Sequence, residues 1–439
     1  MTIQSEILPA VLGGRPTFPP EKDISFPLYD EHEQSALDSV LADFLAGTPR
    51  RVDRIAEFEK EFAAIHDVRH AIAVSSCTAG LAVALASIGT GPGDEVIVTP
   101  FSFISSATSV LMVGAVPVFV DICPQTLCLD PAAVEAAITS RTKAILPVHI
   151  GGVPARMAEI VDIAASRGIR IIEDCAQAPM AKSNKSFVGT IGDAGVFSFG
   201  LSKFISSGEG GAIITNNDAI AEKCRALREF GVIKGMGEYT HTDLGWNYQI
   251  SSLQAGILTS QLKKLANITS VRNQNGQFLA QQIGRIPGLR PVIGMSGDRN
   301  VYYMFMILLD ESRFGLSRSR LIASLKAEHV PVCDTTQTPF PLYKNPVFSP
   351  TGIVMTKCPF KCQESAKAIA STTCQIAENV YRDIIIIGHP KMSRIMNRSS
   401  EEMTAVANVF SKLHYHADQL NGYFDGPKRE CAEGILFAG

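Results

Sequence analysis

The first part of the chain alternates short apolar runs with segments that have the spacing of amphipathic helices. The apolar runs predict strands at residues 70–74, 95–99, 116–120, 143–149, 169–173, 195–199 and 212–215. Helical spacing at residues 79–86, 105–114 and 157–167 separates several of these strands. Strands that alternate with helices indicate βαβ units, in which a largely parallel sheet is covered on both faces. This part therefore predicts an α/β domain.

The pattern changes after residue 216, where longer helical stretches begin. Helices are predicted at residues 218–230 and 251–274, and again at 318–328 and 401–420. A strand is predicted at residues 302–309, between the two pairs. This order indicates a connecting helix followed by a smaller α+β domain.

At about 150 residues per domain, a chain of 439 residues allows two to three domains. We expect an N-terminal arm at residues 1–34, a large domain at 35–285 and a small C-terminal domain at 286–439. Within the small domain, residues 335–357 are rich in Pro, Thr and aromatic side chains and predict a long ordered loop. Loops of this length are usually functional or disordered.

Composition and charge exclude several classes of partner. Lys plus Arg number 40 and Asp plus Glu number 43, so the net charge of −3 argues against binding to nucleic acids or to anionic membranes. Apolar residues make up 46% of the chain, which is typical of a compact globular protein. The apolar runs are far shorter than the roughly 20 residues that a membrane span needs. Since the N-terminus has no basic region followed by an apolar stretch, we expect the protein in the cytoplasm.

The cysteines argue against both disulfides and metal. Ten of them are dispersed over a long chain, a distribution that favours reduced thiols over a disulfide framework. The closest pair, Cys358 and Cys362, lacks a second pair or a histidine cluster at metal-ligand spacing. No metal site is expected.

Polar residues at the carboxyl ends of the strands are the candidates for chemistry, because ligands of open α/β sheets bind there. At residues 74–80 a strand ends in small hydroxyl residues and a helix begins, so free N–H groups there suit a phosphate. The alternative is a simple helix cap. Asp174 follows the apolar strand at 169–173, where an isolated Asp is as often a cap as a catalytic group.

Two further places lie downstream. Lys203 stands between two apolar strands, with the glycine-rich turn at residues 207–211 behind it. Most lysines are solvated surface groups, but a lysine at a strand end beside apolar neighbours suits Schiff-base chemistry. Residues 245–249 contain the only tryptophan, Trp246, which we expect to be a buried aromatic at a helix start.

Together these motifs resemble one family. The segments GPGDEVIVTPFSFISSAT, VGAVPVFVDI, AILPVHIGG, IIEDCAQA, GDAGVFSFGLSKFISSGEGGAIITNN and GWNYQISSLQAGILTSQL fall within about residues 35–420. They are similar to the DegT/StrS family of aminotransferases, which use pyridoxal 5′-phosphate (PLP) and act on keto-sugars and keto-cyclitols. The resemblance implies the aspartate-aminotransferase-like fold (fold type I), with a mostly parallel seven-stranded sheet in the large domain and a smaller α+β C-terminal domain.

The resemblance also implies roles for single residues around the cofactor ring. Lys203 would form the Schiff base with PLP and then move the proton that converts it to pyridoxamine 5′-phosphate. Asp174 would pair with the pyridinium nitrogen and keep the ring protonated. Phe103 would stack on the ring, and Gln177 would lie near its phenolic oxygen.

Other residues would hold the phosphate. The resemblance implies contacts from the backbone of Cys77 and Thr78, from the Thr78 hydroxyl and from Ser198. Asn247 matches a residue that reaches the phosphate of the neighbouring subunit. The active site would then be composite, and the working unit at least a homodimer.

Three positions depart from the family pattern. Cys77 replaces the usual glycine, Gly200 stands where many members have His or another large residue, and Gln249 replaces the Arg of the common NYR sequence. Members that carry out sugar 3-dehydration have His at the position of Lys203, so that branch is disfavoured.

The C-terminal segments FPLYKNPVF and ENVYRDIIIIGHP resemble the cyclitol branch. This branch includes glutamine-dependent aminotransferases of 2-deoxy-scyllo-inosose and the 3-amino-5-hydroxybenzoate synthases. The resemblance implies amination of a keto-cyclitol or keto-sugar in secondary metabolism, with glutamine or glutamate as donor. His149, His389 and Tyr343 are candidates to face the substrate, although histidines with structural partners are commoner.

Three alternatives stay open. The first is a PLP enzyme that dehydrates and aromatises its substrate, as a 3-amino-5-hydroxybenzoate synthase does. The second is a non-catalytic PLP-binding regulator, because fold does not decide function. Against it stands the full set Asp174, Gln177, Ser198, Lys203 and Asn247, which a decayed member would not keep. A nucleotide-dependent oxidoreductase is weaker, since no GxGxxG opens the first βα unit.

Overall fold

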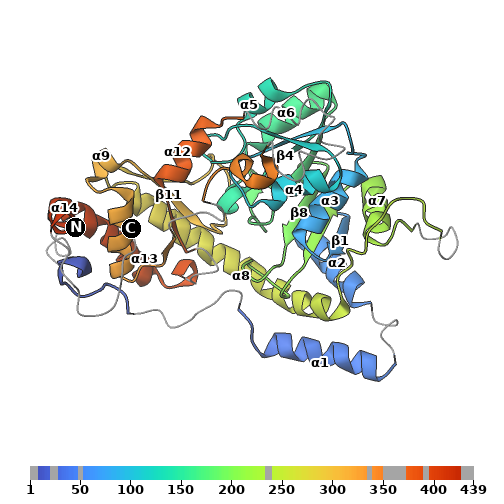
Figure 1. Cartoon of the computed structure of the whole chain (residues 1–439). Coiled ribbons are helices and arrows are strands. Elements are labelled where there is room, and N and C mark those ends of the chain that lie inside the picture. The colour runs from blue at the N-terminus through green and yellow to red at the C-terminus, as the bar shows by residue number, and fades with distance from the viewer. Residues whose placement is uncertain are drawn as a thin grey trace.

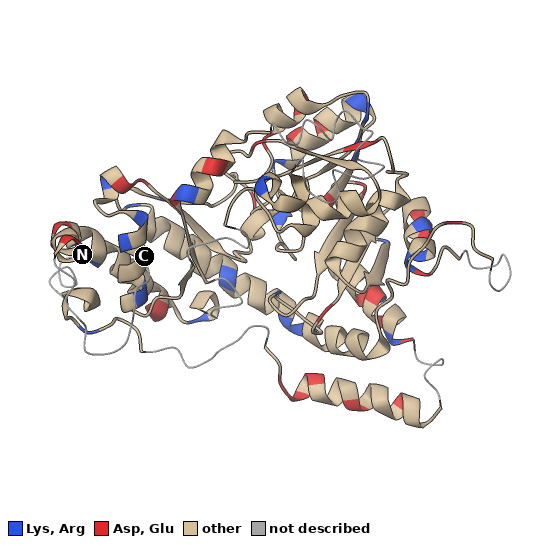
Figure 2. Cartoon of the chain, viewed as in Figure 1, with Lys and Arg blue, Asp and Glu red and all other residues tan. Residues whose placement is uncertain are grey.

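The protein folds into a large α/β domain and a smaller α+β domain, which lie side by side along the helix α8 (Ser252–Ile283) (Figure 1). The computed structural model describes residues 8–19, 28–47, 53–232, 240–333, 339–349, 372–388 and 395–426. Acidic and basic residues are interspersed along the ribbon (Figure 2). Within these segments, no helix has both the length and the apolar character needed to cross a membrane.

The large domain is built on a seven-stranded sheet with the order β1-β9-β8-β5-β4-β2-β3. Its strands are β1 (His70–Val74), β2 (Glu95–Val98), β3 (Val116–Phe119), β4 (Thr142–Leu146), β5 (Arg170–Asp174), β8 (Ala194–Ser198) and β9 (Gly211–Thr215). The pairs from β3 to β8 are parallel, and only β9 runs antiparallel to its neighbours β1 and β8. This confirms the α/β fold with a mostly parallel seven-stranded sheet.

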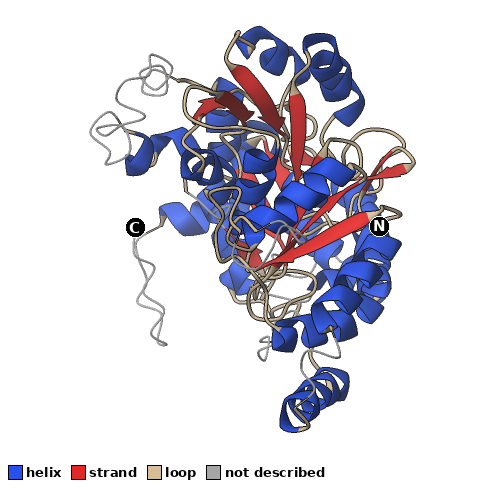
Figure 3. Ribbon diagram, turned by 90° about the vertical axis from the view of Figure 1, so that its right-hand side faces the viewer, coloured by secondary structure: helices blue, strands red, loops and turns tan. Residues whose placement is uncertain are grey.

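Helices cover both faces of this sheet (Figure 3). They are α3 (Cys77–Ser87), α4 (Ser105–Met112), α5 (Pro131–Ala137), α6 (Met157–Arg167) and α7 (Asp218–Arg228). Because the sheet is covered twice, its strands are continuous apolar runs rather than alternating ones. The small residues of α3 allow close packing: a Cβ at Gly80 would lie 2.7 Å from Val196 Cγ1.

The outer edge of the sheet is protected at β1. The Ala73 N–H donates to Glu59 Oε1 (2.8 Å), and Arg228 Nη1 donates to the Ala73 carbonyl (2.9 Å). Glu59 and Arg228 form an ion pair (2.6 Å). Edge strands expose unpaired backbone groups, and this pair satisfies two of them.

The small domain contains an antiparallel sheet with the order β10-β11-β13-β12. Its strands are β10 (Leu289–Pro291), β11 (Phe305–Leu309), β12 (Val332–Cys333) and β13 (Ile384–Ile387). Its helices are α9 (Glu311–Phe314), α10 (Arg318–Ala327), α13 (Ser400–Tyr415) and α14 (Ala417–Asp425). A short hairpin of the large domain, β6 (Lys182–Ser183) and β7 (Ser186–Phe187), forms a separate two-stranded sheet.

Three other segments tie the parts together. Helices α1 (Glu31–Leu45) and α2 (Arg54–Ile65) pack against α8. Residues 8–18 dock on the small domain, where the buried Glu328 accepts from the Ala10 N–H (2.8 Å) and pairs with Lys412 (2.7 Å). Helix α12 (Gln375–Asp383) rests on the large domain, because Asp121 accepts hydrogen bonds from its first amides.

Element boundaries differ from the sequence expectations in several places. The helix expected at 251–274 extends to Ile283, and the one expected at 401–420 is divided at His416. The strand expected at 302–309 begins only at Phe305, because Tyr302 has a φ of 48°. Helices α1, α2 and α5 were not expected, although Asp30 and Glu33 form a capping box that marks the start of α1. Of the loop expected at 335–357, residues 339–349 are described and contain two short 3-10 turns.

Candidate active site

The residues singled out in the sequence gather at the carboxyl ends of the central strands. Asp174 ends β5, Ser198 ends the adjacent β8, and Lys203 lies in the loop that leaves β8. Cys77 opens α3 directly after β1. The charge of Lys203 acts on both Asp174 and Cys77, so these groups share one environment.

Asp174 is a buried carboxylate with an incomplete set of partners. Its Oδ2 accepts from the Ser106 hydroxyl (2.8 Å) and its Oδ1 from the Ala176 N–H (3.1 Å). Ser106 is in turn hydrogen-bonded to Ser102 (2.9 Å), which lies in the loop before α4. Burial raises the pKa of Asp174, while the hydrogen bonds from Ser106 and Ala176 and the charge of Lys203 act in the opposite direction. Among the described side chains none forms an ion pair with it.

Lys203 is half-buried and its amine carries no carboxylate partner within the described part of the chain. The Nζ atom lies 4.8 Å from the centroid of the Tyr303 ring, which comes from the start of the small domain. The backbone N–H of Lys203 donates to the Gly200 carbonyl (2.9 Å). An acid and an amine, each without an ion-pair partner, therefore lie at the same end of the sheet.

The start of α3 and the end of β8 form a tight cradle. Ser76 caps the helix by accepting from the Ala79 N–H (3.1 Å), and the Thr78 hydroxyl donates to Ser105 (2.8 Å). Gly211 is the cross-strand partner of Ser198 and lies close to the start of α3. A Cβ at Gly211 would lie 2.7 Å from the Cys77 nitrogen. The helix N-terminus with its free N–H groups is thus brought beside Ser198, an arrangement suited to an anion.

The Cys77 side chain does not add a reactive group to this cradle. Burial raises the pKa of its thiol well above the ordinary value, so the thiol stays protonated. The buried cysteines of the described segments are free thiols, at positions 77, 123, 128, 175, 224 and 374.

Phe103 and Gln177 differ in exposure. The Phe103 side chain is 47% exposed, although it follows the buried Ser102. Gln177 is buried, and its Oε1 accepts from the Gly151 N–H (2.7 Å), which leaves its NH₂ group as a donor. Phe103 therefore offers an exposed aromatic ring, and Gln177 offers an amide donor, in the segments that follow β2 and β5.

Asn247 lies on the surface, in a segment that runs past the end of β1. The segment is fixed there because the Tyr248 carbonyl accepts from the Ser75 N–H (2.8 Å). Trp246 is only half-buried and stacks on Tyr248 with ring centroids 5.4 Å apart. Trp246 is thus less buried than expected.

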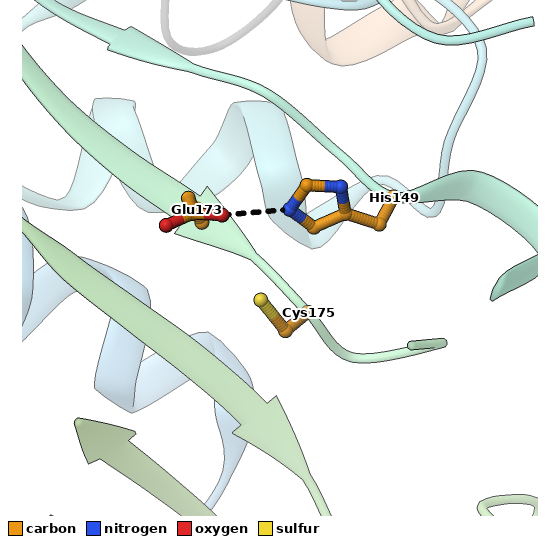
Figure 4. Close-up of side chains that lie close together, drawn as sticks. All are labelled: His149, Glu173 and Cys175. Carbon is orange, nitrogen blue, oxygen red and sulfur yellow. Dashed lines mark hydrogen bonds and ion pairs between the residues drawn. The ribbon is translucent and has the colours of Figure 1, made fainter. Parts of the chain in front are cut away.

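His149, Glu173 and Cys175 form a buried cluster at the end of β5 (Figure 4). His149 Nε2 lies 3.1 Å from Glu173 Oε2, and its Nδ1 accepts from the Ala155 N–H (3.0 Å). Glu173 also accepts three backbone N–H groups, those of Gly189, Ile191 and Gly192. Hydrogen bonds thus occupy the nitrogen and oxygen atoms of His149 and Glu173, and burial raises the pKa of the Cys175 thiol. The geometry is that of a structural clamp on the loop 189–192 rather than a metal centre.

The other candidates for substrate contact are Tyr343 and His389. Tyr343 is buried, donates to Glu378 (2.7 Å) and accepts from the Cys374 N–H (3.1 Å), so it fixes the chain before α12. His389 lies outside the described residues. Gly200 is not required by the backbone, since a Cβ there would make only ordinary contacts with Glu209 and Ser198.

Sequence reasoning missed Ser102, Ser106 and Tyr303, and it named Gly211 only as part of the glycine-rich turn at residues 207–211. The two serines had a signal, since both are small hydroxyl residues soon after a strand, although only Ser106 lies within helix α4. Tyr303 had none, because its contact with Lys203 spans the domain boundary.

Comparisons with known proteins agree with this geometry. Residues 29–377 match the model of the DegT/DnrJ/EryC1/StrS aminotransferase family. The chain is 37% identical over 352 residues to the L-glutamine:2-deoxy-scyllo-inosose aminotransferase of Streptoalloteichus tenebrarius, covering 76% of this chain and 82% of that protein. It is 36% identical over 315 residues to the spore coat polysaccharide biosynthesis protein SpsC of Bacillus subtilis, covering 70% and 80%. The structure superposes on that of 3-amino-5-hydroxybenzoic acid synthase with a TM-score of 0.77 at 31% identity, covering 91% of this chain and 99% of that one.

Proposed function

The chain belongs to the DegT/DnrJ/EryC1/StrS aminotransferase family, and from this premise we propose that it moves an amino group from glutamine or glutamate to a keto-cyclitol or keto-sugar, with PLP as its cofactor. The chemistry class, that of a sugar or cyclitol aminotransferase, follows from the family. The observation that carries the finer proposal is the pair of groups without ion-pair partners in the described site, the buried Asp174 carboxylate and the Lys203 amine.

The residues of the site fit PLP. When bound, PLP supplies an aldehyde that an amine can attack and a protonated ring that accepts electrons. Lys203 would hold it through its amine and return the proton to the substrate carbon. Asp174 would keep the proton on the ring nitrogen, and a buried acid without a cation is well placed for this, because the ring would supply the missing positive charge. Ser106 would orient the Asp174 carboxylate.

The remaining contacts would fix the ring and the phosphate. Phe103 offers an exposed aromatic face, and Gln177, three residues after Asp174, keeps its NH₂ group as a donor. The N–H groups of Cys77 and Thr78 would bind the phosphate together with the hydroxyls of Thr78 and Ser198. Gly211 supports this proposal, because no larger residue would let β9 pass so close to the helix start.

We also propose a homodimer with a composite site. Asn247 is exposed on a segment fixed beside β1, as expected of a residue that serves the neighbouring subunit. A second subunit would contribute it to the phosphate. The cytoplasmic location expected from the sequence stays a prediction.

The acceptor is argued from the relatives. One relative bears the name of a glutamine:inosose aminotransferase, which supports a cyclitol ketone and a glutamine donor. SpsC is named for polysaccharide biosynthesis, which keeps keto-sugars in the proposal. The superposition on 3-amino-5-hydroxybenzoic acid synthase keeps the dehydrating and aromatising alternative open.

The covalent step is tested by trapping. Borohydride reduction of the enzyme with PLP, followed by peptide mapping, is expected to leave the cofactor on the peptide that carries Lys203. Lys203→Ala is expected to abolish the adduct and all turnover while lowering the free energy of unfolding by no more than about 1 kcal/mol, because the amine is half-buried, has no ion pair within the described residues and contacts the Tyr303 ring. Lys182→Ala is the matched control, since Lys182 Nζ also lies near an aromatic ring, 4.2 Å from the Phe187 centroid. An adduct on another lysine contradicts the proposal.

The alternatives are separated by substrates. Conversion of the cofactor to its amino form by glutamine or glutamate supports transamination, and its absence with both donors favours a regulator. A panel of keto-cyclitols and keto-sugars then identifies the acceptor. An aromatic product from an amino-dehydroshikimate-like ring would favour the synthase alternative.

A further inference from the structure

Tyr303 brings the small domain into contact with the loop that carries Lys203. Its side chain is fully buried, and the Lys203 Nζ lies 4.8 Å from its ring centroid. Its hydroxyl donates to the Ser202 Oγ (3.4 Å), and its ring packs edge-on against Phe204 (5.7 Å, 70°). One aromatic side chain therefore contacts three consecutive residues of the loop.

The Tyr303 backbone is held in place by Arg272 of α8. The Arg272 guanidinium is fully buried and donates to the carbonyls of Tyr303 (3.1 Å) and Tyr302 (2.7 Å). It also lies 5.3 Å from the centroid of the Phe204 ring. Burial lowers the pKa of Arg272 to about 9, because removing the guanidinium from water disfavours its charged form. Arg272 thus contacts both the Tyr303 backbone and the Phe204 ring, which packs against Tyr303.

The face of an aromatic ring attracts an ammonium group but not a neutral amine. The lysine side chain is flexible, and such an attraction offsets the conformational entropy that is lost when the side chain is held in one position. In this structure the Lys203 ammonium contacts the face of the Tyr303 ring.

We propose that Tyr303 is a positioning residue for Lys203, supplied by the small domain. Its ring holds the lysine ammonium whenever that amine is not bonded to the cofactor, so docking of the small domain places the reactive amine. The meaning of this contact for catalysis rests on the proposed function, but the contact itself does not.

Competitive acetylation tests the proposal on the full chain after removal of the cofactor. The rate at Lys203 is measured by mass spectrometry relative to Lys182, which keeps its own aromatic neighbour. Tyr303→Leu is expected to raise this relative rate about two- to fivefold, the value of an exposed to partly buried cation–π contact. Tyr303→Phe keeps the ring and is expected to leave the rate unchanged. Equal rates in the Leu variant and the unmodified chain overturn the proposal, as do equal rates in the Leu and Phe variants.

A second substitution covers the case in which Tyr303→Leu does not fold. Pentafluorophenylalanine at position 303 keeps the shape of the ring and reverses its charge distribution. It is expected to label Lys203 as fast as the Leu variant would, whereas a rate equal to that of Tyr303→Phe shows packing alone and overturns the proposal.

Kinetics of the enzyme with PLP give an independent measure. A positioning role lowers kcat and kcat/KM together in Tyr303→Leu, and Tyr303→Phe restores both. A rise in KM for the donor at unchanged kcat contradicts it. Failure of the proposed function is recognised separately, because the borohydride adduct is then missing from the unsubstituted enzyme while the acetylation result stands.

Discussion

Glu173 and Asp174 are consecutive carboxylates on one strand, yet their surroundings are opposite in kind. Side chains alternate along a strand, so the two acids point to different faces of the sheet. Glu173 is fully buried and accepts four hydrogen bonds, three from the loop 189–192 and one from His149. Asp174 accepts two and forms no ion pair with any described residue. The difference teaches that burial does not mark a functional acid, whereas an incomplete set of partners does.

The largest effect is expected where this difference is removed at Asp174. Asp174→Asn should still bind PLP but lose about a hundredfold or more of its transamination rate, because a neutral amide cannot hold the ring proton. Thermal unfolding of the cofactor-free variant should occur at the same or a higher temperature, since burial raises the pKa of this carboxyl group. Half-reaction rates and calorimetry measure the two effects. Near-normal turnover contradicts the assigned role.

Glu173→Gln is the matched control on the same strand. The amide can accept through one oxygen only, so N–H groups of the loop 189–192 lose their partner. We expect a loss of about 3 kcal/mol in the free energy of unfolding, as for buried groups left unpaired. The folded fraction should keep its turnover. Unchanged stability in urea unfolding would remove the distinction between the two acids.

His66 tests how far the argument from missing partners extends. It is buried among Phe62, Phe187 and Phe197, and its Nε2 has no hydrogen-bond partner among the residues that the structure describes. Burial lowers its pKa from 6.5 to about 4, so the folded state disfavours the charged form. The stability that it contributes is complete above about pH 6.5 and is lost as the pH falls toward 4, by about 2 kcal/mol at pH 5.

The measurement is urea unfolding between pH 8 and pH 5. His66→Phe removes the titrating group and should reduce the pH dependence by this amount. If the variant and the unsubstituted chain respond alike, the histidine is not the source. Unlike Asp174, His66 lies among apolar rings rather than beside an anion cradle and an amine, so a missing partner signals function only at a site that can receive a ligand.

Much of the fold could be predicted because the signals are local. The helix at Met157–Arg167 begins and ends where expected, and the strands of the large sheet lie within a few residues of their predicted ranges. Among the helices that were predicted, α8 extends furthest beyond its expected range, because its last turns pack on the small domain and have no local signal of their own.

The candidate site could be predicted only in part. Asp174 and Lys203 were candidates because each follows an apolar run. The family motifs then implied their roles. The hydrogen bond from Ser106 to Asp174 joins residues 68 positions apart, and no periodicity reveals such a pair. Tyr343 was a candidate because of its motif. Its hydrogen bonds with Glu378 and Cys374, which hold the start of α12, also join distant residues and left no local signal.

The sequence by itself determined the class of fold, the family and the residue types at the strand ends, since apolar runs and short motifs are properties of neighbouring residues. Only the tertiary structure decided which of the two adjacent acids, Glu173 or Asp174, lacks a full set of hydrogen-bond partners. It also decided which aromatic ring lies over Lys203. The physical reason is that hydrogen-bond saturation and ring contacts depend on groups brought together from distant strands and from another domain. The free energy of these contacts therefore depends on tertiary packing, and it cannot be predicted from a local sequence pattern.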